Sequence, residues 1–134
     1  MDQILTFILS HCSFLYNEYS FRFMDSKISD SFGGDAYLDL GSETIIMRLT
    51  RDRGQLFLEF RSAYEKKQNW YSIDLIRKLI TGEKEYHSIM DEENAKFLEN
   101  NFTEVVDYFS HANLSETLKK LEKLKLKRSK DLFG

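Results

Sequence analysis

Apolar side chains at the start of the chain recur at helical spacing. Between Asp2 and Tyr19 they return every three or four residues, which predicts one helix with a single buried face. Residues 21–24 then change to β-type composition, and Gly33-Gly34-Asp35 is typical of a turn. We therefore expect a strand near residues 21–28. The predicted helical face comprises Ile4, Leu5, Ile8, Cys12, Leu15, Tyr16 and Tyr19.

The centre of the chain alternates apolar and polar residues, which predicts three consecutive antiparallel strands. Gly41-Ser42 indicates a two-residue type II′ turn, because glycine stands at its first central position. For the next turn, a three-residue loop over residues 52–54 splits the apolar set, whereas a four-residue loop between Thr50 and Gln55 aligns it. The expected pairs are Leu40 with Glu43, Leu38 with Ile45, Ala36 with Met47, Leu49 with Leu56, Met47 with Leu58, and Ile45 with Phe60.

This pairing divides the predicted sheet into two faces. One face is apolar and needs helices to cover it. The other mixes aromatic and charged side chains, and the pairing places Arg48 between Asp35 and Phe57. The apolar face comprises Ala36, Leu38, Leu40, Ile45, Met47, Leu49, Leu56, Leu58 and Phe60, and the mixed face comprises Tyr37, Asp39, Thr44, Ile46, Arg48, Phe57, Glu59 and Arg61.

The second half of the chain predicts one more strand and then helices. Tyr64 and Trp70-Tyr71 flank a polar run, which is typical of a hairpin with a short further strand. Ser72 is a good N-cap for a helix, and Gly82 stands just past its expected end.

Two further helices are expected after residue 90. Asp91 is a suitable N-cap for the first of them, which Asn100-Asn101 is expected to interrupt. Asn113 with Glu116 resembles a capping box ahead of the last helix. The sequence thus predicts an α+β fold, a single domain over residues 1–134. It contains an antiparallel β-meander of four to five strands, an N-terminal helix, and C-terminal helices packed on one face.

Composition favours a folded protein of the cytoplasm. The chain has 134 residues, 42% of them hydrophobic, which is enough for one connected core. Its single cysteine, Cys12, excludes an internal disulfide and a multi-thiolate metal site. The apolar run of residues 4–9 lacks the preceding positive charge of a signal peptide, and no stretch is long enough to span a bilayer.

Charge is unevenly distributed along the chain. The net charge is −3, yet the helical tail of residues 114–134 is basic and the rest is acidic. A basic cluster can contact nucleic acid, but basic residues near a helix C-terminus are also favoured by the helix dipole. We favour a solvated helical face and keep nucleic-acid binding as the alternative. The basic residues are Lys119, Lys120, Lys123, Lys125, Lys127, Arg128 and Lys130.

Candidate catalytic chemistry is weak. His11, His87 and His111 lie far apart and form no metal-ligand spacing, and His11 and Cys12 point about 100° apart on a helix. Glu83, Glu85 and residues 91–93 are acidic, but helix capping accounts for the latter. No glycine motif for phosphate binding occurs. We therefore expect no catalytic, cofactor or metal site, while an enzyme whose groups converge only in the fold stays open.

The mixed sheet face is the remaining candidate. A plain solvated face explains it, but aromatic and arginine side chains together are also what the centres of protein interfaces prefer. A partner-binding surface is expected to use Tyr37, Ile46, Arg48, Phe57, Glu59 and Arg61.

The layout of an N-terminal helix, a β-meander with Asp52-Arg53-Gly54-Gln55 at one tip, and trailing helices resembles the small immunity proteins of bacterial polymorphic toxin systems. The resemblance covers most of the chain and assigns no functional residue. It implies a protein without a cofactor that binds a toxin and blocks its active site. Our hypothesis is accordingly a non-catalytic protein-binding module in the cytoplasm, with a protein partner and no membrane contact.

Overall fold

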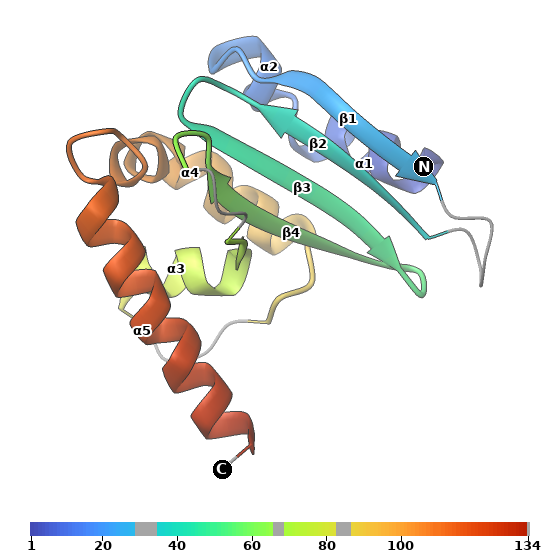
Figure 1. The fold of residues 1–134 in the computed structure, drawn as a ribbon. Helices are drawn as coiled ribbons and strands as arrows, with labels where there is room; N and C mark the ends of the chain where they lie inside the picture. The colour runs from blue at the N-terminus through green and yellow to red at the C-terminus, as the bar shows by residue number, and fades with distance from the viewer. Residues whose placement is uncertain (29–34, 66–68, 83–86, 134) are drawn as a thin grey trace.

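The computed structural model describes residues 1–28, 35–65, 69–82 and 87–133, and its elements follow the predicted order (Figure 1). Five antiparallel strands form one sheet in the order β1-β2-β3-β4-β5, so each strand pairs with its neighbour in the chain. The predicted α+β meander with an N-terminal helix and C-terminal helices is confirmed. The strands are β1 (Arg22–Ile28), β2 (Ala36–Gly41), β3 (Ile45–Asp52), β4 (Gln55–Ser62) and β5 (Tyr71–Ser72). The helices are α1 (Asp2–His11), α2 (Phe14–Glu18), α3 (Ile73–Thr81), α4 (Glu92–Tyr108) and α5 (Leu114–Phe133).

The N-terminal helix is broken in two, which the sequence did not predict. α1 ends at His11, and α2 begins after Ser13. Phe14 and Leu15, the first two residues of α2, are both buried. Phe14 then packs edge-on against Phe102 of α4, with ring centroids 5.7 Å apart.

The first hairpin turn lies two residues later than predicted. It spans Ser42 to Ile45, where the Ser42 amide donates to the Ile45 carbonyl at 2.9 Å. The Ser42 hydroxyl also accepts from the amides of Thr44 and Ile45, so a side chain closes this turn. The predicted glycine turn is therefore wrong, and Leu40 pairs with Met47.

The second hairpin turn is a two-residue loop, and the predicted four-residue loop is wrong. Asp52 pairs with Gln55, while Arg53 and Gly54 between them have φ angles of 52° and 82°. Two central residues with positive φ are what a type I′ turn requires. Leu49 accordingly pairs with Leu58, and Met47 with Phe60.

Both corrections shift the register by an even number of residues, so every side chain keeps its predicted face. All nine residues of the predicted apolar face are buried, and Met47 and Phe60 are completely so. Helices complete the core on this side of the sheet, with Ile4 and Ile8 from α1 and Leu98 and Phe102 from α4. Figure 1 shows α1 and α4 behind the sheet as drawn.

Most of the C-terminal helices begin and end close to the predicted residues. α3 begins after Ser72 and ends at Thr81, and Gly82 directly after it has a φ of 73°. α4 runs without interruption through Asn100 and Asn101, and the Asn101 side chain donates to the Phe97 carbonyl one turn earlier. The expected interruption is therefore wrong. α5 is the longest helix described and packs along α3 (Figure 1).

Some predictions fall outside the described residues. They are the turn at Gly33-Gly34, the acidic residues Glu83 and Glu85, and most of the polar run after Glu65. Among the helices that the structure does describe, none combines the length and the hydrophobicity needed to cross a membrane.

Candidate partner-binding surface

We call the side of the sheet opposite the core the outer face, and Arg48 lies at its centre. Arg48 on β3 pairs with Asp39 on β2 and with Glu59 on β4. The sequence predicted that Arg48 lies between Asp35 and Phe57. This was wrong, because the predicted registers of both hairpins differ from the observed ones. The new register sets the arginine between two carboxylates, which is a favourable cross-strand arrangement.

Arg48 is fixed by contacts on three sides. Its Nε donates to Oδ1 of Asp39 at 2.8 Å and its Nη2 donates to Oδ2 at 3.0 Å, which makes a bidentate ion pair. Its Cζ lies 3.9 Å from the centroid of the Tyr37 ring and 4.7 Å from that of the Trp70 ring. The hydrogen bond with Asp39 is the main cause that raises the pKa of Arg48, against the opposing effect of burial. The guanidinium is permanently charged and held in one orientation.

Trp70 is one of the residues that contact Arg48, although the sequence analysis placed it only next to a predicted strand. Tyr71 pairs with Phe60 and is buried in the core, so the preceding residue points to the opposite side of the sheet. The alternation of Trp70 and Tyr71 was the signal that could have placed the indole on the outer face. Lys125 of α5 donates to the Trp70 carbonyl at 3.4 Å and so ties this segment to the last helix.

Arg61 differs from Arg48 in its hydrogen bonding. Its Cζ lies 5.4 Å from the centroid of the Trp70 ring. Its Nε is buried, and within the described part of the chain that atom has no hydrogen-bond partner. A guanidinium nitrogen that is removed from water and left without an acceptor costs free energy.

The predicted surface residues are brought together on the outer face, but they are not equally accessible. Ile46 is only 6% exposed and Asp39 only 7%, so both support the surface from within the protein. Tyr37, Phe57 and Glu59, together with both arginines, are partly exposed and available for contact. The outer face is therefore a half-buried surface, not a fully solvated one.

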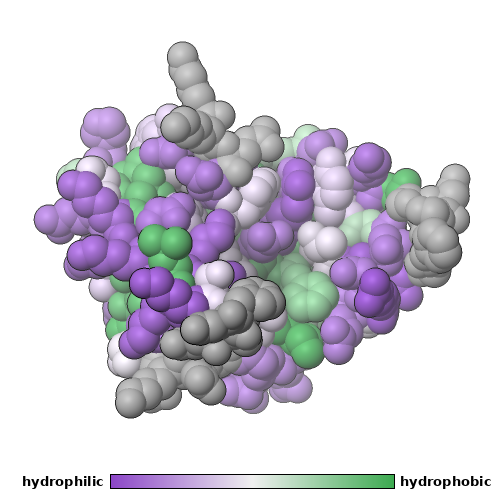
Figure 2. Space-filling view, turned by 60° about the horizontal axis from the view of Figure 1, so that its bottom comes forward, coloured by the Kyte–Doolittle hydropathy of each residue, from purple (hydrophilic) through white to green (hydrophobic). Residues whose placement is uncertain are grey.

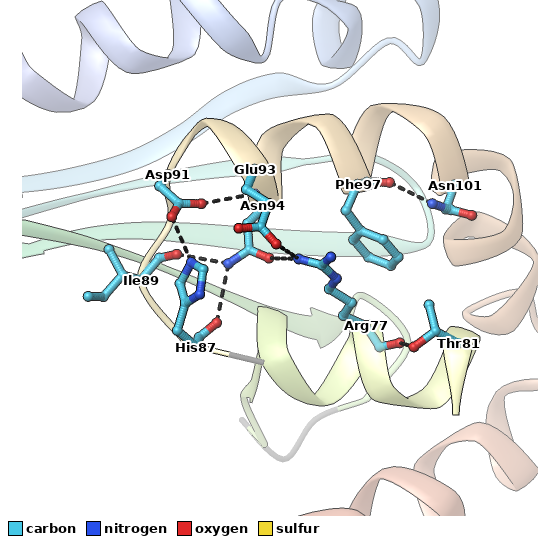
Figure 3. A network of polar contacts seen from close by, with 9 residues as sticks. All are labelled: Arg77, Thr81, His87, Ile89, Asp91, Glu93, Asn94, Phe97 and Asn101. Carbon is cyan, nitrogen blue, oxygen red and sulfur yellow. Dashed lines mark hydrogen bonds and ion pairs between the residues drawn. The ribbon is translucent and has the colours of Figure 1, made fainter. Parts of the chain in front are cut away.

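A second polar cluster joins the start of α4 to α3 (Figure 3). His87 Nε2 lies 2.6 Å from Oδ2 of Asp91, and Oδ1 of Asp91 accepts from the Asn94 amide at 3.0 Å. Arg77 donates through Nη1 to Oε1 of Glu93 at 3.2 Å. Burial raises the pKa of the Asp91 carboxyl, but the Asn94 amide and His87 outweigh it and leave that pKa below its usual value.

Of the described residues, His87, Asp91 and Glu93 form the group whose potential metal-binding atoms lie close enough together, within 4.8 Å. Each of them already makes a contact inside the protein, and the predicted capping role of Asp91 is confirmed. These internal contacts explain the arrangement without an ion.

Asn94 connects this cluster to the segment that precedes α4. It is completely buried, and its amide group donates to the carbonyls of His87 at 3.2 Å and Ile89 at 2.8 Å. The segment held in this way reaches β4, where the Met90 amide donates to the Leu56 carbonyl at 2.7 Å. The cluster thus fastens residues 87–90 along the edge of β4.

The other candidate residues are separate. Cys12 is buried as predicted, and burial, with the nearby charge of Glu99, raises the pKa of its thiol to about 12. The imidazole of His11 lies beside Phe7, and that of His111 lies beside Tyr64. The part of the chain seen in the structure brings none of these groups into a common site.

Two residues of the basic tail are engaged inside the molecule. Arg128 donates through Nη1 to Asp74 at 2.8 Å and to the Ser72 hydroxyl at 2.7 Å. Lys125 lies over the Tyr71 ring at 5.3 Å. Part of the tail's positive charge therefore holds α5 against α3 and β5.

Comparison with known proteins identifies no similar protein. No family model matches the chain, and neither a curated protein nor a solved structure is similar enough to match.

Proposed function

We propose that this chain is a non-catalytic protein-binding module that holds its partner on the outer face. One observation carries the proposal, namely the stack of Tyr37, Arg48 and Trp70 with Arg61 beside it. Tryptophan, tyrosine and arginine are the residues that most often dominate binding energy at protein interfaces. Because Arg48 is already fixed, little side-chain freedom remains for it to lose on binding.

Arg61 indicates the chemistry of the partner. The charge of Arg48 is balanced by Asp39, but the buried Nε of Arg61 has no acceptor among the residues described. A carboxylate of a partner would balance the charge of Arg61 by pairing with the part of its side chain that is exposed, through a charge-assisted hydrogen bond. The partner surface is accordingly expected to place an aspartate or glutamate over Arg61, next to an apolar group over Phe57.

An immunity-type inhibitor is the specific form of this proposal. Its support is the resemblance in layout to the immunity proteins of bacterial toxin systems, which act by covering an active site. In that case the partner is a toxin, and its gene lies beside the gene for this chain. The product of the adjacent gene should then be toxic when expressed alone and tolerated when it is expressed with this chain.

Charge reversal at Arg61 tests the outer face. Tagged wild-type protein with a photo-crosslinking amino acid at Phe57 should capture one defined protein in its native host. Arg61→Glu should lower that yield by at least about tenfold, since an attractive contact becomes a repulsive one. Arg48→Glu is unsuitable, because it would leave the carboxylate of Asp39 buried without its partner.

Arg53→Glu is the matched control for Arg61→Glu. It makes the same charge change on the same sheet, but Arg53 lies on the β3–β4 turn with 93% of its side chain exposed. Equal capture by wild type and Arg53→Glu, with loss in Arg61→Glu, supports the proposal. Equal capture by all three proteins, or by none, contradicts it.

A further inference from the structure

In the part of the chain that the structure describes, one edge of the sheet is open. β1 pairs with β2 along one side, and no described strand lies along its other side. All seven residues of β1 are exposed. An edge strand of this length presents unpaired amide and carbonyl groups, and natural proteins usually protect such an edge.

The exposed apolar side chains gather near this edge. Phe23, Met24 and Ile28 of β1 are each 58% exposed, and Leu9 of α1 is 67% exposed. By contrast, the side of the molecule at the bottom of Figure 1 is mainly hydrophilic, with only small separate apolar areas (Figure 2). Of the eight large apolar residues that are exposed in the described part, six lie in α1, α2 and β1.

Helix geometry places Leu5 and Leu9 toward the open edge. Gln3 contacts the other side, where its side chain accepts from Arg51 of β3 and donates to the Gly54 carbonyl. On a helix Leu5 and Leu9 share one face, and Gln3 lies on roughly the opposite one. The two leucines therefore extend the apolar area of β1 beneath the same edge.

We infer that β1 is a self-association edge, where it pairs with β1 of a second copy in antiparallel orientation about a two-fold axis at Ser26. In this register Asp25 of each copy stands opposite Lys27 of the other, which gives two ion pairs from one symmetric contact. An axis at Asp25 or at Lys27 would instead place like charges opposite each other.

The outer face and the charges of β1 are compatible with this pairing. Asp25 and Lys27 pair with Asp39 and Tyr37 of β2, so both lie on the outer face, as directly opposed residues must. The β-bulge between Phe23 and Asp25 limits the regular stretch to the residues around Ser26. The dimer joins two five-stranded sheets into one and turns both outer faces to the same side.

Sedimentation equilibrium of the full chain tests the inference. The wild type should show a species of twice 15.9 kDa whose population rises with concentration. Lys27→Asp should weaken dimerisation by at least about tenfold, because both ion pairs become repulsive contacts. The double exchange Asp25→Lys with Lys27→Asp should restore it, since the pairs reform with their charges reversed. Lys123→Asp, an exposed position on α5, is the matched control and should dimerise as the wild type does.

A cross-link across the axis gives a second measurement. Ser26→Cys should form a disulfide-linked dimer under mild oxidation, because directly opposed residues of antiparallel strands approach within bonding reach. The native Cys12 is only 1% exposed and does not compete. Ser115→Cys, exposed on α5, should link far less. A wild type that stays monomeric at all concentrations overturns the inference, and so does a dimer that ignores Lys27→Asp or is not rescued by the double exchange.

Discussion

The two edges of the sheet differ in what lies beside them. The edge of β4 is covered by β5 at one end, where Tyr71 pairs with Phe60, and by Ile89 at the other, where it bridges Phe57. The edge of β1 has no such cover among the described residues. One side of the sheet is thus built into the core of the protein, and the other is available for contact.

This difference between the edges predicts two separate effects of substitution, one on the stability of the fold and one on self-association. The segment beside β4 is held in place by the buried side chain of Asn94, so a change there disturbs satisfied polar groups. A change on β1 alters side chains that already face water. Substitutions at the covered edge should therefore act on folding, and those at the open edge on self-association.

The largest expected effect is that of Asn94→Ala at the covered edge. The substitution removes the donors to the carbonyls of His87 and Ile89 within a buried cluster, so we expect unfolding to become easier by about 2–4 kcal/mol. Urea denaturation measures this change. Hydrogen exchange at the Met90 amide should also become faster, because the segment of residues 87–90 is no longer held by the Asn94 side chain.

Asn100→Ala is the control for Asn94→Ala, since it makes the same substitution at an exposed position of the same helix. Its effect should stay within about 0.5 kcal/mol. Similar losses in both variants would show that the loss does not come from the buried hydrogen bonds of Asn94, since alanine favours a helix more than asparagine does.

A smaller effect is expected for Asp91→Ala, which removes the N-cap of α4 beside the same edge. At neutral pH it should cost about 1 kcal/mol, the usual value of a capping residue. The pKa of Asp91 is lower in the folded than in the unfolded protein, so its carboxylate stabilises the fold above the unfolded-state pKa. This stabilisation is lost as pH falls through the folded-state pKa, below about pH 4. The wild type and the variant should converge there in thermal unfolding.

Asp107→Ala separates capping from a general effect of charge. Asp107 stands near the C-terminal end of the same helix, where a negative charge opposes the helix dipole. Its removal should leave stability at neutral pH unchanged or slightly higher. If Asp107→Ala destabilises the protein as much as Asp91→Ala, the capping explanation is wrong.

The sequence predicted the faces of the sheet but not the pairing of its strands. The side-chain alternation of β2, β3 and β4 was visible in the order of residues, and a register shift of two or four preserves it. The turns depend on local interactions that periodicity does not report. Ser42 closes one turn with its hydroxyl, and Arg53 adopts a positive φ that asparagine or aspartate would have signalled.

The sequence predicted which residues form the outer face, but not which of them contact one another. Arg48 was identified as a central side chain, but its ion pair with Asp39 followed only from the true register. Trp70 lies outside the three central strands and meets Arg48 only through the folding of the chain around β5. The open state of β1 could not be predicted either, because strand composition alone does not show whether a strand has one neighbour or two.

The smallest expected effect on stability belongs to Ile28→Thr at the open edge. Ile28 is 58% exposed, and threonine keeps the β-branched shape that strands favour, so unfolding of the monomer should change by no more than about 0.5 kcal/mol. The measurement uses urea at a protein concentration where the wild type is monomeric. In the same samples at higher concentration, dimerisation should become weaker, because Ile28 belongs to the exposed apolar area of the β1 edge. A large loss of monomer stability would mean that β1 is already covered in solution and that the two edges are alike.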